Sequence, residues 1–149
     1  MATVAYNVAS GIIEFPPKIT SIMAFTVLVV DDNPVQAATR QSILTYSGNN
    51  VVVATSASHA LALLEDPELS RNISLIITDH LMPLLNGPQF IARLRQRFPT
   101  MPVLVLSGMP DAEIEYAGMN VLYRQKPIAP EELIQLTESL CKTTLGRTA

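Results

Sequence analysis

Five short apolar segments recur along the chain, and stretches with helical character separate them. The segments are rich in valine, leucine and isoleucine, as expected for strands that are buried on both faces of a sheet. They are residues 25–30, 51–54, 75–78, 102–106 and 120–123. Because strands that alternate with helices pair in parallel through βαβ units, this pattern predicts an α/β fold, an open parallel sheet with helices on both faces.

The residues between these strands carry signals for the ends of helices. Asn33 is a favourable N-cap and Pro34 suits a first helical turn, while Gly48 supplies a stop. A second helix opens at Ser56 and should end before Pro67, where the pattern breaks. The remaining helices are predicted to begin at Gly87 and at Pro130.

Length and composition fit one globular domain. The chain has 149 residues, of which 48% are hydrophobic and 15% charged, which suits a well-filled core rather than disorder. A net charge of -3 and the lack of a basic stripe argue against direct binding of nucleic acid. Its single cysteine, Cys141, excludes an internal disulfide and multi-thiolate zinc sites, and is expected to be a buried hydrophobe.

The sequence predicts three regions and no membrane segment. Residues 1–24 form an N-terminal extension, either partly disordered or, because Met23 directly precedes the first strand, upstream of the true start. Residues 25–142 form the domain and residues 143–149 a C-terminal tail. No apolar run approaches the roughly 20 residues of a membrane helix, and no signal peptide is evident, so we expect a cytoplasmic protein.

Polar residues that could bind a ligand or take part in a reaction follow four of the five strands. Asp31 and Asp32 follow the first strand, Asp79 the third, Ser107 the fourth and Lys126 the fifth. Because the carboxyl ends of parallel strands meet at one edge of a sheet, where ligands bind in such folds, these side chains should converge. Any one of them alone is more often a cap or turn former, but the joint pattern favours a functional site.

Three converging carboxylates repel one another unless a cation joins them. Oxygen ligands favour a hard ion, and Mg²⁺ fits because it accepts a few carboxylates and keeps several waters. Lys126 adds a positive charge and Ser107 a hydroxyl donor, which together suit a phosphoryl group carried on one carboxylate.

These residues resemble the signature of two-component response regulator receiver domains. The resemblance rests on Val30-Asp31-Asp32, Asp79-His80-Leu81-Met82-Pro83 with Gly87, Ser107-Gly108 and Lys126-Pro127, and covers about residues 25–142. It implies a flavodoxin-like, doubly wound sheet of five strands in the order 2-1-3-4-5. It also implies a stand-alone phosphoacceptor switch, similar to the chemotaxis regulators, which catalyses only its own phosphorylation and dephosphorylation.

The resemblance assigns a role to each site residue. Asp79 would be the phosphoacceptor, with Mg²⁺ held directly by Asp32, through water by Asp31, and by Asp79 itself and the backbone carbonyl of Leu81. Ser107 and Lys126 would contact the phosphoryl oxygens. Tyr123 would report phosphorylation by rotating, and Pro127 matches a cis-proline position.

Three features depart from the usual receiver pattern. His80 invites a metal or cobalamin interpretation, but its spacing does not fit the cobalamin pattern, and a packing role is favoured. Leu81 and Met109 are apolar where many receivers carry polar residues, which predicts slow loss of the phosphoryl group. Only residues 109–121 separate the last two strands. A helix capped by Asp111 would therefore be shortened, and the segment looser than in a typical receiver.

Three other functions fit the sequence less well. An interaction module that has lost phosphorylation is disfavoured because the acidic, hydroxyl and lysine positions are intact. A flavin or nucleotide binder needs a glycine-rich loop after the first strand, where this chain is acidic. A DNA-binding regulator needs an output domain, and only seven residues follow Lys142. The expected partners are a histidine kinase or phosphotransfer protein and an effector or phosphatase in trans, with a homodimer left open.

Overall fold

The computed structural model describes residues 24–148, with side chains as far as residue 143. The predictions for residues 1–23 therefore lie outside the described residues. Five parallel strands form one sheet in the order β2-β1-β3-β4-β5, which confirms the predicted fold class and strand order. The strands are β1 (Thr26–Val30), β2 (Asn50–Ala54), β3 (Ile73–Asp79), β4 (Val103–Ser107) and β5 (Leu122–Gln125).

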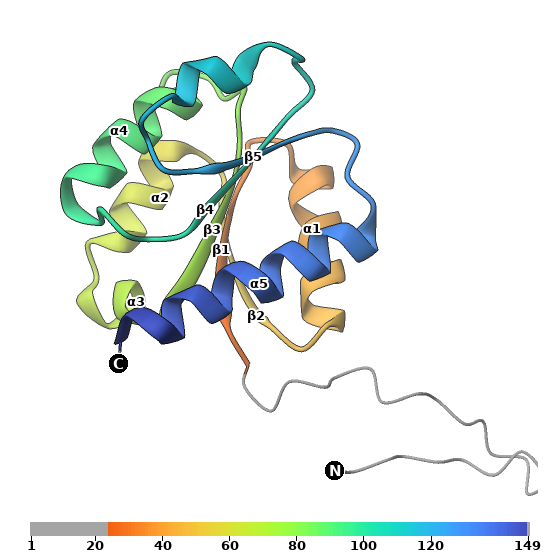
Figure 1. The fold of residues 1–149 in the computed structure, drawn as a ribbon, viewed down its shortest axis with the longest axis vertical. Helices are drawn as coiled ribbons and strands as arrows, with labels where there is room; N and C mark the ends of the chain where they lie inside the picture. The colour runs from red at the N-terminus through yellow and green to blue at the C-terminus, as the bar shows by residue number, and fades with distance from the viewer. Residues whose placement is uncertain (1–23, 149) are drawn as a thin grey trace, which may run out of the picture.

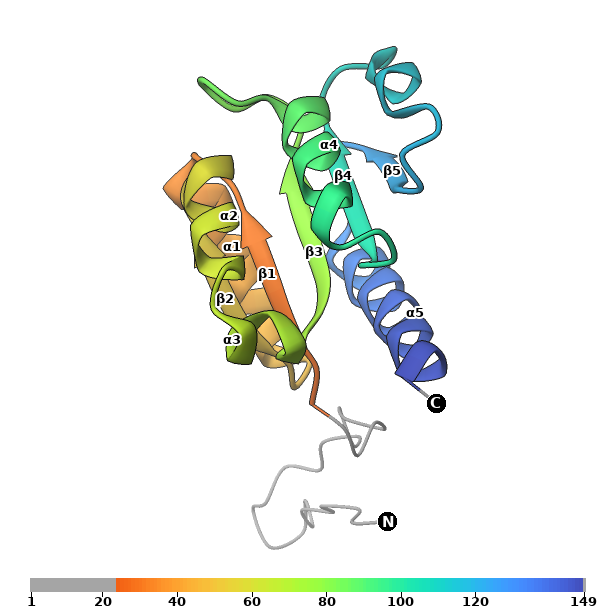
Figure 2. The ribbon, with the colours of Figure 1, turned by 90° about the vertical axis from the view of Figure 1, so that its left-hand side faces the viewer.

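Helices cover both faces of this sheet (Figures 1 and 2). They are α1 (Pro34–Tyr46), α2 (Ala57–Leu64), α3 (Pro67–Asn72), α4 (Gly87–Arg97), the 3₁₀ helix η2 (Ala112–Tyr116) and α5 (Pro130–Thr148). Alternate strand residues face opposite helical layers, so Val27 and Val29 pack with α1 and α5, whereas Leu28 packs with α2 and α4. The sheet is thus buried on both sides, as its continuous apolar strands require.

Capping side chains fix where the helices begin. Asn33 caps α1 by accepting hydrogen bonds from two backbone N–H groups, Ser56 caps α2 by accepting one from the N–H of His59, and Asn86 forms a capping box with Gln89 at α4. The predicted start signals at Asn33, Ser56 and Pro130 are confirmed, and Gly87 is the first residue of α4.

One helix was missed. The sequence predicted that a helix ends before Pro67, but Pro67 also begins α3, a helix of six residues. Asp66 is its N-cap and accepts a hydrogen bond from the N–H of Glu68 at 3.0 Å. Proline is tolerated in a first turn because its missing N–H would have no helical partner there, so the proline that marks the break after α2 is also the first residue of α3.

The segment between β4 and β5 is short, as predicted. It holds only η2, five residues of 3₁₀ helix, which confirms the shortened fourth helix. The predicted cap is wrong, because the Asp111 side chain makes no capping hydrogen bond. The last strand begins at Leu122 rather than at residue 120, because Asn120 adopts a left-handed conformation (φ 57°) that turns the chain just before it.

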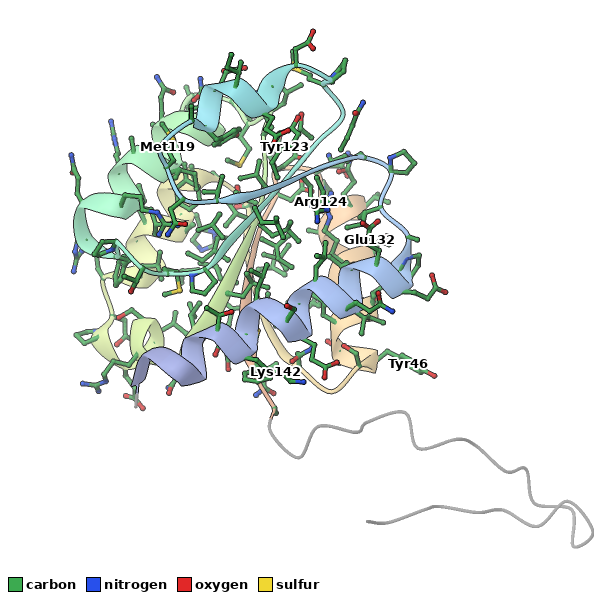
Figure 3. The ribbon with its side chains drawn as sticks, in the orientation of Figure 1. Tyr46, Met119, Tyr123, Arg124, Glu132 and Lys142 are labelled. Atoms are coloured by element: carbon green, nitrogen blue, oxygen red, sulfur yellow. The ribbon has the colours of Figure 1, made fainter. Side chains whose placement is uncertain are left out.

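Arg95 of α4 anchors the far end of this segment. Its guanidinium donates hydrogen bonds to the carbonyl groups of Met119 (2.9 Å) and Asn120 (2.8 Å). The same group also donates to the carbonyls of Phe98 and Met101, both at 2.8 Å. The turn that contains Met119 (labelled in Figure 3) is therefore fastened to the end of α4.

The last helix closes one face of the molecule. It continues to Thr148, into the region predicted as a tail. Cys141 lies fully buried on its inner side, and burial raises the pKa of the thiol to about 12. This confirms a packing role for the cysteine. None of the helices in the described residues is both long enough and apolar enough to cross a membrane.

Candidate functional site

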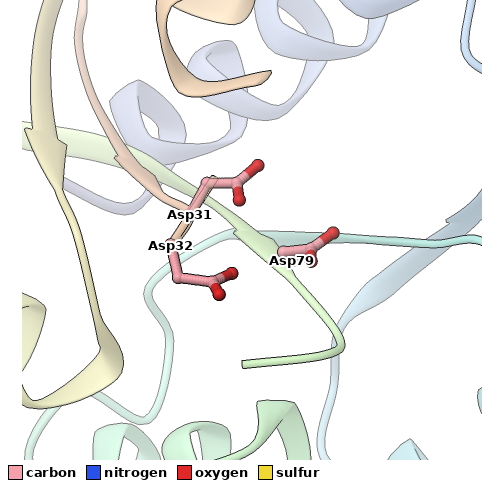
Figure 4. Close-up of side chains that lie close together, drawn as sticks. All are labelled: Asp31, Asp32 and Asp79. Carbon is pink, nitrogen blue, oxygen red and sulfur yellow. The ribbon is translucent and has the colours of Figure 1, made fainter. Parts of the chain in front are cut away.

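Three carboxylates meet where β1 and β3 end. Asp31 and Asp32 directly follow β1, and Asp79 is the last residue of β3, the neighbouring strand in the sheet. Each offers a carboxylate oxygen, and these oxygens all lie within 4.8 Å of one another (Figure 4). Asp31 and Asp79 are buried, whereas Asp32 is exposed. The predicted convergence of the acidic side chains is therefore present in the structure.

Lys126 reaches the same cluster from the end of β5. Its ammonium forms an ion pair with Oδ1 of Asp79 and donates a hydrogen bond of 2.8 Å to Oε1 of Gln36 on α1. The peptide bond between Lys126 and Pro127 is cis. The backbone N–H of Lys126 donates to the carbonyl of Ser107 at 2.7 Å, so the lysine and the serine lie side by side at the edge of the sheet.

The donor set fits a hard divalent cation. Apart from the ion pair with Lys126, Oδ1 of Asp79 is buried with no hydrogen-bond donor among the described residues. The carboxylate of Asp32 also lacks a protein partner within that part of the chain, since it enters none of the hydrogen bonds or ion pairs. In proteins Mg²⁺ is usually coordinated by a few carboxylate oxygens that lie close to one another, and water occupies its remaining coordination positions. The carbonyl of Leu81 stays a predicted ligand.

Asp31 differs from its neighbours because protein groups already engage both its oxygens. Oδ1 accepts the N–H of Asn33 at 2.9 Å, and Oδ2 pairs with Nη1 of Arg40 at 2.6 Å. Burial raises the pKa of Asp31 above its ordinary value, and the negative charge of Asp79 adds to the increase. The Asn33 N–H and the positive charge of Arg40 oppose it.

Arg40 was not identified from the sequence. It lies on the inner side of α1 and is itself buried, with only 7% of its surface exposed. The buried residues of α1 are Ala37, Arg40 and Leu44, so the arginine occupies a place where the helical repeat would put an apolar side chain. The weak apolar stripe of this helix was the one available signal.

His80 bonds to the segment before β5 rather than to the acidic cluster. Its ring is buried, and Nδ1 lies 2.6 Å from the hydroxyl of Tyr116 in η2. Its Nε2 is 3.6 Å from a carboxylate oxygen of Glu115. Burial raises the pKa of Tyr116 above its ordinary value, and the charge of Glu115 contributes. Gly87 makes room for this contact, because a Cβ there would overlap the Tyr116 hydroxyl.

Ser107 and Tyr123 connect through the backbone of one residue. The N–H of Met109 donates to Oγ of Ser107 at 2.9 Å, and the Tyr123 hydroxyl donates to the Met109 carbonyl at 2.7 Å. Tyr123 extends from β5 beside η2, with its ring 6.1 Å from that of Tyr116 (Figure 3). A change at the Ser107 hydroxyl is therefore two hydrogen bonds away from the Tyr123 ring.

Apolar side chains are exposed on the loops that follow β3 and β4. The exposed fraction is 60% for Leu81, 101% for Leu84 and 43% for Met109. Leu84, which the sequence did not single out, also has a positive φ of 68°. Hydrophobic side chains therefore lie close in sequence to both Asp79 and Ser107.

Comparison with known proteins gives a consistent result. A family model described as "Response regulator receiver domain" matches residues 27–138. A 14.6 kDa protein of Leptolyngbya boryana is 36% identical over 121 residues, which cover 77% of this chain and 88% of that protein. The hydrogenase transcriptional regulatory protein HoxA of Cupriavidus necator is 38% identical over 114 residues, or 73% of this chain and 22% of HoxA.

The similarity extends to solved structures. The receiver domain of the Francisella response regulator 1452 superposes with a TM-score of 0.71 at 30% identity, over 80% of this chain and 98% of that one. Several curated relatives are much longer proteins, and the matched region spans only 19% to 50% of four of them. Their similarity to this chain therefore concerns one domain of each.

Proposed function

Because the chain belongs to the response regulator receiver domain family, we propose that it is a signal-transduction switch that accepts a phosphoryl group on Asp79 with the help of Mg²⁺. One observation carries the assignment to this residue. Asp79 alone joins the two halves of the site, since it belongs to the cluster of three carboxylates and also forms the ion pair with Lys126.

The residues divide the work of phosphoryl transfer as follows. An oxygen of Asp79 attacks the phosphorus of the donor, a new O–P bond forms, and the bond to the leaving group breaks. A carboxylate is a weak nucleophile, so alignment and neutralisation of charge supply most of the rate. Asp32 and Asp79 would hold Mg²⁺, which when bound would neutralise part of this charge. Lys126 contributes its positive charge beside Asp79, and Ser107 offers its hydroxyl to a phosphoryl oxygen.

Partners and location follow from the same proposal. The donor is a histidine kinase or a phosphotransfer protein, and an effector or phosphatase reads or removes the phosphoryl group. The protein works in the cytoplasm, and its own catalysis is limited to gaining and losing the phosphoryl group. Relatives such as HoxA carry additional sequence beyond the matched region, so their further activities are not transferred to this chain.

Intact-mass measurement tests the proposal directly. Incubation with a small-molecule phosphodonor and Mg²⁺ should add the mass of one phosphoryl group to the chain. A chelator such as EDTA should prevent the addition, because without a metal the repulsion among the carboxylates is not relieved. No added mass in the presence of Mg²⁺, with a known receiver domain labelled in parallel, would rule the proposal out.

The exposed apolar side chains predict slow loss of the phosphoryl group. Leu81 and Met109 lie two residues after Asp79 and Ser107, respectively, and offer no polar group that could orient an attacking water. Replacing Leu81 with asparagine and Met109 with lysine should shorten the lifetime of phospho-Asp79 several-fold. This is about the effect of one hydrogen bond that orients the attacking water. Replacement of the exposed Val35 by asparagine is the matched control. An unchanged or longer lifetime in the double variant would contradict this explanation.

The switch should be read on the face formed by residues 109–123. In this proposal Ser107 moves toward the phosphoryl group, and Tyr123 turns inward as its bond to Met109 changes. The short η2 helix should exchange its amide hydrogens readily before activation and become protected afterwards. Hydrogen exchange with and without a phosphoryl mimic measures this. Equal, high protection in both states would show that the segment is already rigid.

A further inference from the structure

A buried arginine of α1 lies beside the acidic cluster and pairs with Asp31. Nη1 of Arg40 contacts Oδ2 of Asp31 at 2.6 Å, and both side chains are almost fully buried, at 8% and 0% exposed. An arginine is always charged in proteins, so this position holds a permanent positive charge. The pair also leaves Asp31 without an oxygen free of protein contacts.

Gln36 lies between this arginine and Lys126 and contacts both. Its Oε1 accepts a hydrogen bond from Lys126 at 2.8 Å and a longer one from Nη2 of Arg40 at 3.4 Å. Two cations from different elements are thus directed at different carboxylates, Arg40 at Asp31 and Lys126 at Asp79. The division leaves Asp32 as the carboxylate without a protein cation among the described residues.

The charge balance shows what Arg40 changes. Three carboxylates facing two cations leave one net negative charge in the cluster, whereas a neutral side chain at position 40 would leave two. With Arg40 present, a bound Mg²⁺ would exceed the negative charge of the cluster by one, and this excess would disappear once Asp79 carries a phosphoryl group with about two negative charges. The arginine therefore disfavours the metal before phosphorylation and favours the phosphoryl group afterwards.

We propose that Arg40 is a built-in counter-charge for Asp31 that lowers the affinity of the unphosphorylated site for Mg²⁺. Arg40 acts by its charge, which the ion pair with Asp31 holds beside the cluster, and it need not touch the metal or the phosphoryl group. This inference rests on the proposed function only in taking Mg²⁺ as the metal of the site.

The test compares Mg²⁺ affinities of charge variants. Arg40→Gln keeps an amide donor for Asp31 but removes the charge, so Mg²⁺ should bind about tenfold more tightly than in the wild type. Arg40→Lys keeps the charge and should stay within about twofold of the wild type. Arg93→Gln removes an exposed charge from α4 and is the control for net charge. Calorimetry, or tyrosine fluorescence in this tryptophan-free chain, follows the titration.

A second comparison guards against misfolding of the single variant, because Arg40→Gln leaves a buried carboxylate poorly compensated. In an Asp31→Asn background no such charge remains, and adding Arg40→Gln there should again tighten Mg²⁺ binding about tenfold. Unchanged or weaker binding on removal of Arg40 in this background would overturn the inference. A wild type that binds no Mg²⁺ would instead count against the proposed function.

Discussion

Replacing Asp79 with asparagine is expected to reduce the added phosphoryl mass from one group per chain to none. The amide that replaces the carboxylate is neutral and a much poorer nucleophile, and it also removes the partner of Lys126. The two other carboxylates of the cluster are poorly placed to substitute. Asp31 is committed to Arg40 and Asn33, and Asp32 has no ion pair with the lysine in the described residues.

The control for this variant makes the same aspartate-to-asparagine substitution at a position away from the site. Asp66→Asn also exchanges a carboxylate for an amide, but asparagine is an equally good N-cap and should keep the hydrogen bond to Glu68 that begins α3. It should be phosphorylated like the wild type. Full labelling of the Asp79→Asn variant would show that another residue is the acceptor, and fragment masses would identify it.

Loss of Asp32 should weaken Mg²⁺ binding far more than loss of Asp31. Asp32→Asn removes the carboxylate that no donor in residues 24–143 occupies, and a decrease in affinity on the order of a hundredfold, about 3 kcal/mol, is expected. Asp31→Asn removes a group whose oxygens already serve Arg40 and Asn33, so about tenfold or less is expected.

The same Mg²⁺ titrations distinguish an aspartate that binds the metal from one that only contributes nearby negative charge. Asp111→Asn, an exposed substitution outside the cluster, serves as the control and should leave the affinity near that of the wild type. Equal losses for Asp31→Asn and Asp32→Asn would leave the acidic cluster intact as the metal site. They would show, however, that the two aspartates contribute alike and that the contacts of Asp31 do not withdraw it from the metal.

The positions of the acidic residues could be predicted because backbone topology alone brings them together. Parallel strands deliver their carboxyl ends to one edge, so a residue that follows β1 and one that ends β3 must become neighbours. The same reasoning places Ser107 and Lys126, whose strands pair directly. No knowledge of side-chain packing was needed for these residues.

Arg40 could not be predicted in this way. Its burial depends on how α1 is rotated against the sheet, which the strong cap at Asn33 does not determine and the weak apolar stripe does not reveal. The start of β5 could not be predicted either, since it depends on the left-handed turn at Asn120. Gly118 is the one sequence signal for a turn just before this strand. The contact between His80 and Tyr116 likewise joins residues 36 positions apart.

The two anchors of η2 have a consequence for how such a protein can diversify. Tyr116 joins this short helix to His80, and Arg95 joins the following turn to α4, so side-chain contacts set the position of the segment although its own helix has only five residues. The side chains of Glu113 and Ile114 are exposed, with 79% of Ile114 accessible to solvent. If the proposed switch is read on this segment, substitutions at these two positions would change which partner proteins bind while the residues of phosphoryl transfer stay unchanged, so that partner choice and chemistry could evolve separately.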